Sequence, residues 1–165
     1  MTAAKILVRD QRSKRAMAPR PEAAWYLLGA SGLVFALVSA VDNLVAWYPM
    51  FFGNVEWKFG TVTTTLHNIP LLALGLVLLL ASAVVRGRRI QVRIGAVVML
   101  VMALIVVGCL VLYLPTIGTA REAVTDPVAR LGLTRSIVKT LAQAVMYLVM
   151  FGWIGWAAWH YSSSE

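Results

Sequence analysis

Charged residues are scarce in this chain, and acidic residues are the scarcest. Only 13% of its 165 residues are charged, with 7 Asp or Glu against 15 Lys or Arg, while 60% are hydrophobic. The charges lie almost wholly between long apolar stretches instead of being spread along the chain. This distribution excludes a soluble globular domain, whose charges would be distributed over its whole surface.

Cysteine and the common catalytic motifs are nearly or wholly missing. Cys109 is the single cysteine, and one thiol can form neither an intramolecular disulfide nor a CxxC pair, which argues against thiol–disulfide chemistry. A cysteine within an apolar segment is normally an inert packing residue. The sequence also contains no HExxH motif, no nucleophile elbow and no phosphate-binding glycine loop. We therefore expect that the protein is not an enzyme.

Four long apolar segments are what the sequence does contain, at residues 23–46, 61–85, 94–114 and 137–160. Each has about 20 residues or more, the length with which an α-helix crosses about 30 Å of hydrocarbon. Lipid cannot pair free backbone amides, so such segments form helices, and their unbroken apolarity excludes the alternating strands of a β-barrel. The predicted fold is an all-α integral membrane protein, a four-helix transmembrane bundle with up-down-up-down topology.

Basic residues are concentrated on one side of this predicted bundle. Six precede the first helix, in an arm at residues 1–22, and a second group lies between helices two and three. The positive-inside rule then places both termini, including the short tail 161–165, in the cytoplasm, with the helices in a bacterial inner membrane. The net charge of +8 indicates that the arm contacts anionic lipid head groups or an acidic partner surface, and not nucleic acid. The second group consists of Arg86, Arg88, Arg89 and Arg93.

Two patterns predict contacts with other helices or other proteins. Gly32, Ala36 and Ala40 recur every four residues along helix one and form a groove in which another helix backbone can pack. The connection between helices one and two, residues 47–60, carries six aromatic side chains that are unfavourable in bulk water. This connection is expected in the lipid interface or beneath another protein.

The second outer connection, residues 115–136, carries signals of local helical structure. A capping-box spacing begins at Thr119, and the pair Asp126–Pro127 is typical of a helix start. Gly132 follows as a stop signal. We expect one or two short surface helices in this connection.

Polar side chains that the topology places in the outer third of the membrane form a candidate site. They come from the end of helix one and from the beginnings of helices two and four. As a ligand site, they bind a small molecule or a lipid. As a structural cluster, Asp42 and Lys139 form an ion pair, and the other side chains link the helices by hydrogen bonds. The members are Asp42, Asn43, Thr64, His67, Asn68, Lys139, Gln143 and Tyr147.

The two histidines are the candidates for cofactor binding. A haem held between helices needs two axial ligands at one depth, whereas His67 lies about 9 Å and His160 about 35 Å from the outer ends of their predicted helices. A bis-histidine haem within one chain is therefore not expected. Chlorophyll-binding antenna helices commonly place alanine four residues before the histidine, where this chain has Thr63 and Trp156. A single-histidine pigment or a quinone is left as an alternative.

Three functions are compatible with these features. We favour a non-catalytic accessory or structural subunit of a larger bacterial membrane complex, with energy-transducing (respiratory or photosynthetic) complexes as candidate hosts. The second is a small-molecule- or lipid-binding membrane protein, or a transporter component, that uses the outer polar cluster. The third is a pigment- or quinone-binding subunit that uses His67 or His160. Transport is disfavoured because the inner halves of the helices carry little polarity beyond Ser31 and Ser82, and a conducting path needs a polar lining.

Overall fold

The computed structural model describes residues 21–163, with side chains from residue 23 onward, so residues 1–20 of the predicted arm and the end of the tail lie outside the described residues. Within this range the chain forms four α-helices and no strand: α2 (Pro21–Trp47), α3 (Val55–Val85), α4 (Arg89–Ala123) and α5 (Pro127–Ser163). All four are long and apolar enough to cross a membrane. The prediction of an all-helical membrane protein with four membrane-length helices is confirmed.

The second predicted helix begins earlier than its apolar segment does. The side chain of Asn54 accepts a hydrogen bond from the backbone N–H of Trp57 at 3.0 Å and caps α3, which satisfies one of the free N–H groups at a helix start. Part of the predicted aromatic connection is therefore the first turns of α3. The helix continues without interruption through Pro70, as membrane helices often do.

The prediction of short surface helices in the second outer connection is wrong. Helix α4 continues to Ala123 and α5 starts at Pro127, so Thr119 and Gly132 both lie inside long helices. The Asp126 carboxylate accepts a hydrogen bond from the Ala129 N–H at 2.8 Å, which confirms the predicted helix start. The other two signals failed because α4 and α5 stay packed together along this segment, and tertiary packing overrides local propensity.

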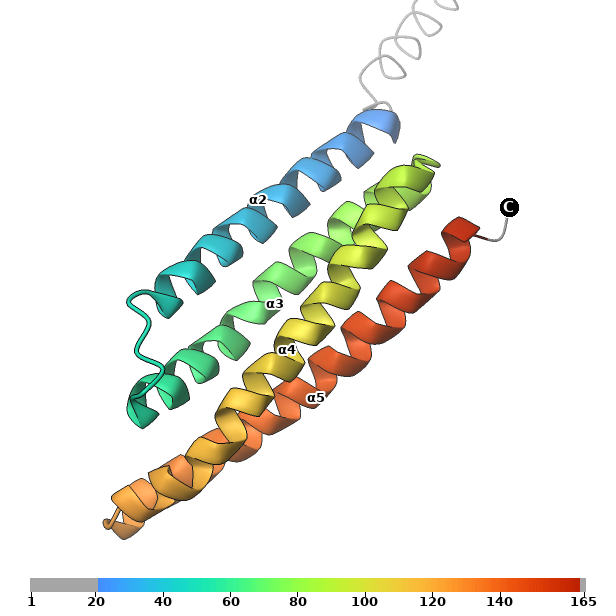
Figure 1. Ribbon diagram of the computed structural model, residues 1–165. Helices are drawn as coiled ribbons and strands as arrows, with labels where there is room; N and C mark the ends of the chain where they lie inside the picture. Colours follow the sequence, from blue (N-terminus) through green and yellow to red (C-terminus); the bar gives the residue numbers. More distant parts are fainter. Residues whose placement is uncertain (1–20, 164–165) are drawn as a thin grey trace, which may run out of the picture.

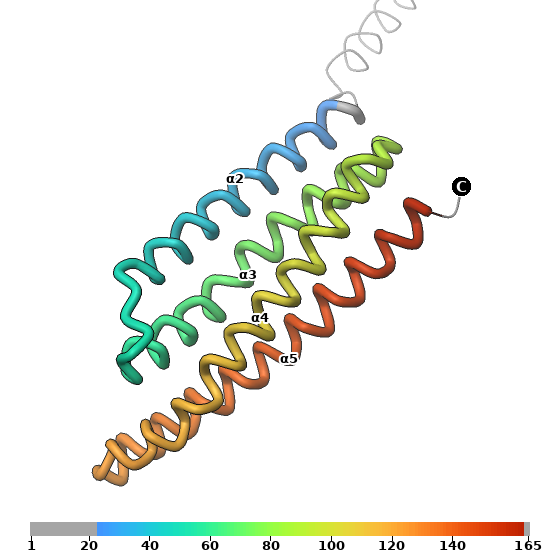
Figure 2. The backbone as a smooth tube through the Cα atoms, in the orientation of Figure 1, coloured from blue at the N-terminus to red at the C-terminus, as the bar shows by residue number. Residues whose placement is uncertain are grey.

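Helices α3, α4 and α5 share one core, and α2 lies outside it against α3 (Figures 1 and 2). Successive helices run antiparallel, and the start of α2 lies at the same end as the end of α5. Among the described helices, α2 packs only against α3, whereas α3 also contacts α4 and touches α5, and α4 pairs with α5. The main core lies between α3, α4 and α5, where Leu66, Val106 and Phe151 are completely buried. Helix α2 is thus a peripheral element held by one neighbour.

Small side chains allow α2 to approach α3 closely. The buried residues of α2, Gly29, Gly32, Ala36 and Ser39, alternate three and four positions apart, the spacing of a helix seam. A Cβ atom added to Gly75 of α3 would lie 2.6 Å from the Gly32 carbonyl oxygen. The backbones are therefore in direct contact, as small-residue seams in membrane helices permit.

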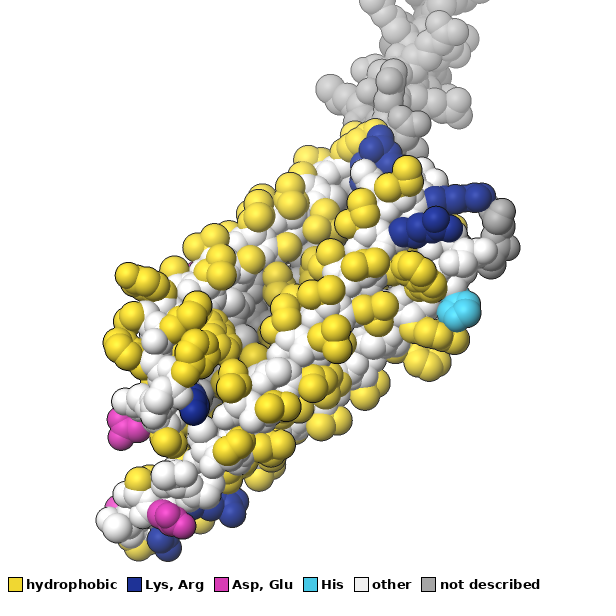
Figure 3. All heavy atoms as spheres, in the orientation of Figure 1, with side chains coloured by type: hydrophobic (Ala, Val, Ile, Leu, Met, Phe, Trp, Pro, Cys, Tyr) yellow, Lys and Arg dark blue, Asp and Glu magenta, His cyan; other side chains and the backbone are white. Residues whose placement is uncertain are grey.

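Charge divides the molecule into two ends (Figure 3). The basic end is formed by Arg86, Arg88, Arg89 and Arg93, where α3 turns into α4. The other end, here called the mixed-charge end, holds lysines and arginines together with acidic side chains. Between the two ends the visible surface carries many hydrophobic side chains and no charged ones, as a lipid-facing surface must. The described acidic side chains are Asp42, Glu56, Glu122 and Asp126.

Candidate functional site

The predicted outer polar cluster is divided by the structure into two groups on opposite sides of α3. The first group lies at the α2–α3 seam. The Asn43 amide donates to the Ser39 carbonyl oxygen at 2.8 Å, and the Ser39 hydroxyl donates to the Asn68 carbonyl oxygen at 2.8 Å. Asp42 is exposed beside this group. The Ser39 hydrogen bond ties α2 to α3, whereas the Asn43 hydrogen bond stays within α2.

The second group lies where α3 meets α5. The Lys139 ammonium nitrogen is 2.8 Å from Nε2 of His67, and both side chains are exposed. The donor and acceptor roles in this contact depend on the tautomer of the imidazole. Thr64 is exposed one turn away on α3 and has no side-chain contact of this kind among the described residues.

The predicted Asp42–Lys139 ion pair is not formed. Helix α2 lies on the side of α3 that faces away from α5, and these two helices make no contact. Lys139 uses the His67 imidazole as its partner instead. The error has a topological origin, because the sequence places both residues at one depth but does not fix which helices are neighbours.

Behind the Lys139–His67 contact, polar atoms are buried in the core. Tyr113 is completely buried, with its ring 5.1 Å from that of Phe59. The Gln143 amide oxygen is buried and has no hydrogen-bond partner within the described part of the chain, whereas the buried Tyr113 hydroxyl lies beside the hydroxyls of Thr63 and Thr140. Tyr147, the remaining predicted member on α5, is buried against Phe151 with ring centroids 6.3 Å apart. Unpaired buried polar atoms are costly, so they mark a place where water or a ligand can bind.

Sequence reasoning missed Tyr113 because it ended the third apolar segment at residue 114. Helix α4 continues for nine more residues, and Val106, Cys109, Tyr113 and Thr116 all lie on its buried face. Their spacing of three and four residues continues the pattern of the preceding apolar segment. That periodicity is the signal that would have placed Tyr113 inside the core.

The two histidines lie in different surroundings and at different depths. His67 is the thirteenth residue of α3 and His160 the thirty-fourth of α5, and both helices start at the mixed-charge end. The difference corresponds to about 30 Å along the helix axes, so one haem cannot be ligated by both residues. The His160 ring packs edge-on against Trp156, with centroids 4.6 Å apart, and remains exposed. Within residues 21–163, no three His, Cys, Asp or Glu side chains converge in a way that could hold a metal ion.

The predicted packing groove on helix one is occupied by α3 of the same chain. Gly32 and Ala36 lie against Gly75 of α3, whereas Ala40 is half-exposed and Ser39 takes its place in the seam. No family model, curated protein or solved structure matches this chain.

Proposed function

We propose that this chain is a non-catalytic accessory subunit of a larger bacterial membrane complex, and that the hairpin formed by the end of α4 and the start of α5 binds a partner subunit. The observation that supports this most directly is the exposure of Val128 (77%) and Leu131 (64%) on that hairpin. These side chains lie in the part of the molecule that extends furthest from the basic end (Figure 1).

The depth of the hairpin follows from helix geometry. Twenty helical residues span about 30 Å, the thickness of the hydrocarbon layer. Counted from Arg93, the layer reaches Tyr113 on α4. The level of Arg93 on α5 is given by its hydrogen bond to the Ser162 carbonyl oxygen at 3.2 Å, and the layer then ends near Ala142, within one turn of Lys139. The Lys139–His67 contact thus lies at the boundary of the hydrocarbon.

The apolar side chains of the hairpin lie beyond this boundary. Leu131 and Val128 are eight and eleven residues before Lys139, or about 12 Å and 16 Å further out. The head-group region adds only about 5–8 Å on each side of the hydrocarbon. Lipid therefore does not cover these residues, and exposed apolar side chains grouped on a protein surface indicate a binding partner. A surface crevice of about 310 Å³, lined by Arg121, Glu122, Arg130, Leu133 and Thr134, adjoins them.

The orientation proposed for the subunit is the one that the basic residues predict. The basic end, with four arginines and no described acidic side chain, faces the cytoplasm of the bacterium under the positive-inside rule. The helices then cross the inner membrane up-down-up-down, with both termini cytoplasmic and the α4–α5 hairpin outside. The clustered rings of Trp47, Phe52 and Trp57, 5.3 to 6.3 Å apart, suit the outer head-group level.

Replacement of the two hairpin residues tests this proposal. The double variant Val128→Asn/Leu131→Asn is expected to migrate as the free chain on native gels after mild extraction, while the wild type co-migrates with a larger complex. Thr119→Asn, an exposed change on the same hairpin, serves as the matched control and should stay in the complex. Unchanged co-migration of the double variant, or a wild type that runs only as a homo-oligomer, would refute the proposal.

A second candidate function is supported by the buried, unpaired Gln143 amide oxygen, which lies one turn from Lys139 on α5, together with the buried Tyr113 hydroxyl. These groups could bind a small polar molecule or the carbonyl of a quinone at the outer boundary of the membrane. Native mass spectrometry with an absorption spectrum tests this function. A bound small molecule that is lost in Tyr113→Phe would support it, whereas a colourless preparation without bound mass would rule it out.

A further inference from the structure

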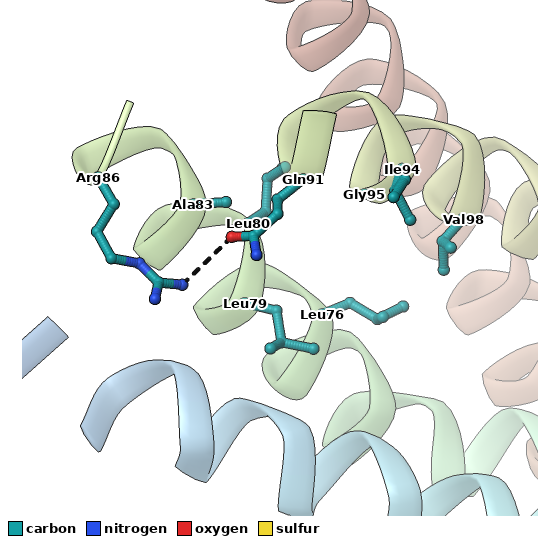
Figure 4. A pocket seen from close by; sticks show the side chains of 9 residues that line it. All are labelled: Leu76, Leu79, Leu80, Ala83, Arg86, Gln91, Ile94, Gly95 and Val98. Carbon is teal, nitrogen blue, oxygen red and sulfur yellow. Dashed lines mark hydrogen bonds between the residues drawn. The ribbon is translucent and has the colours of Figure 1, made fainter. Parts of the chain in front are cut away.

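A groove runs between α3 and α4 from the basic end toward the middle of the molecule (Figure 4). It has a volume of about 260 Å³ and extends from Arg86 and Gln91 at its mouth to Leu76 and Val98. Leu76 lies ten residues from Arg86 along α3, which corresponds to about 15 Å. Because α2 packs against α3 and not against α4, no described helix covers the groove. Its remaining lining residues are Leu79, Leu80, Ala83, Ile94 and Gly95.

The guanidinium group of Arg86 is held at the mouth of this groove. Its Nε donates to the Ser82 carbonyl oxygen at 3.0 Å, and Nη2 donates to the Gln91 amide oxygen at 3.5 Å. Its central carbon lies 4.9 Å from the ring centroid of Tyr26 on α2. Three of the five guanidinium N–H groups have no hydrogen-bond partner among the described residues. A guanidinium fixed in this way is preorganised to bind a phosphate through two hydrogen bonds.

The charge around the groove selects an anionic ligand. Arg88 and Arg93 lie at the same end, and the described carboxylates are all at the opposite end. The side chain of Glu22, at the start of α2, lies outside the described side chains. A zwitterionic lipid would bring an ammonium group into this concentration of arginines, so an anionic head group is favoured. Basic pockets between membrane helices on the cytoplasmic side bind such head groups.

We propose that the α3–α4 groove binds one anionic glycerophospholipid. Its phosphate accepts hydrogen bonds from Arg86 and from the Gln91 amide, and one acyl chain lies along Leu76, Leu80 and Val98. The apolar depth of the groove distinguishes this ligand from a free phosphate, which would use only the mouth. The site is independent of the partner surface on the α4–α5 hairpin, which lies at the other end of the molecule.

The test compares lipid binding by four single variants of the full chain. Delipidated protein in detergent is titrated with phosphatidylglycerol, and binding is measured by native mass spectrometry. We expect Arg86→Gln to weaken binding about tenfold, a loss of about 1.4 kcal/mol, because it removes hydrogen bonds from a charged donor. Gly95→Leu should block the groove, since a Cβ there already lies 2.8 Å from Leu80 Cδ1. Circular dichroism and size-exclusion chromatography confirm that each variant is folded.

Two matched controls keep the proposal falsifiable. Arg88→Gln removes the same charge from the same end without altering the groove, and Gly108→Leu adds the same side chain to α4 at a position with open space. Both are expected to bind phosphatidylglycerol like the wild type. Equal binding of phosphatidylcholine, competition by inorganic phosphate at the concentration of the lipid, or normal binding by both Arg86→Gln and Gly95→Leu would each overturn the proposal.

Discussion

At Gly75, the absence of a Cβ atom allows α2 and α3 to come into direct contact. A Cβ at this position would lie 2.6 Å from the Ala36 backbone nitrogen and 3.0 Å from its Cα, and backbone atoms cannot move aside as a flexible side chain can. We expect Gly75→Ala to destabilise the protein by about 1–3 kcal/mol, the usual cost of overpacking. Thermal unfolding in detergent measures this loss.

Gly108 supplies the control for this prediction. It also lies within a helix, but a Cβ added there meets nothing within 4 Å. Alanine is favoured over glycine in a helix by about 0.5–1 kcal/mol, so Gly108→Ala should be neutral or slightly stabilising. Equal melting temperatures for the two variants would contradict the close approach of α2 and α3.

Trp47 contributes a single polar contact between the end of α2 and α3. Its indole N–H donates to the hydroxyl of Thr65 at 2.9 Å, and Thr65 is buried. We expect Trp47→Phe to cost about 1 kcal/mol, the net value of one hydrogen bond. Trp57→Phe, which changes a neighbouring ring of the same aromatic cluster, should cost less. Chemical denaturation in mixed micelles compares the two, and the reverse order would refute this role of Trp47.

At the scale of elements, the contact between Lys139 and His67 defines how α3 meets α5. A double-mutant cycle with Lys139→Met and His67→Leu should give a coupling energy of about 0.5 kcal/mol, since both side chains are exposed. The cycle that pairs Lys139→Met with Asp42→Asn should give none, because α2 and α5 do not touch. Coupling in the second cycle but not in the first would require a different helix order.

The existence and number of the helices follow from the sequence, but their ends and neighbours do not. Continuous apolarity predicts each membrane span, because the bilayer imposes a fixed length on it. Outside the bilayer no such length constraint applies. The capping signal at Thr119 and the stop signal at Gly132 do not end the helices there, because packing between α4 and α5 outweighs them. The sequence predicts that Lys139 and His67 lie at a similar depth in the membrane. It does not predict which helices are neighbours, because that depends on how side chains fit along α3. The Asp42 pairing failed for this reason.

At the scale of the whole molecule, the position of α2 against α3 and away from α5 predicts which positions can be cross-linked. A Cβ added to Gly29 would lie 3.4 Å from the Cβ of Ser82, close to the separation in disulfides. In a Cys109→Ala background, Gly29→Cys/Ser82→Cys should therefore oxidise to an intramolecular disulfide. Asp42→Cys/Lys139→Cys should keep two free thiols under the same conditions. Maleimide labelling followed by mass spectrometry counts the free thiols, and a linked Asp42–Lys139 pair would indicate a closed bundle.

The position of α3 between two partners has a consequence for how the sequence can vary during evolution. Thr65 and Gly75 pack against α2, while Leu66 and Ile69 lie in the core shared with α4 and α5. Two adjacent stripes of α3 are thus constrained at once, whereas α2 has a single narrow buried stripe and the rest of its surface is largely exposed. Substitutions should accumulate fastest on the exposed face of α2, where almost any apolar residue fits. They should accumulate slowest on α3, because contacts on two of its faces constrain the side chains there.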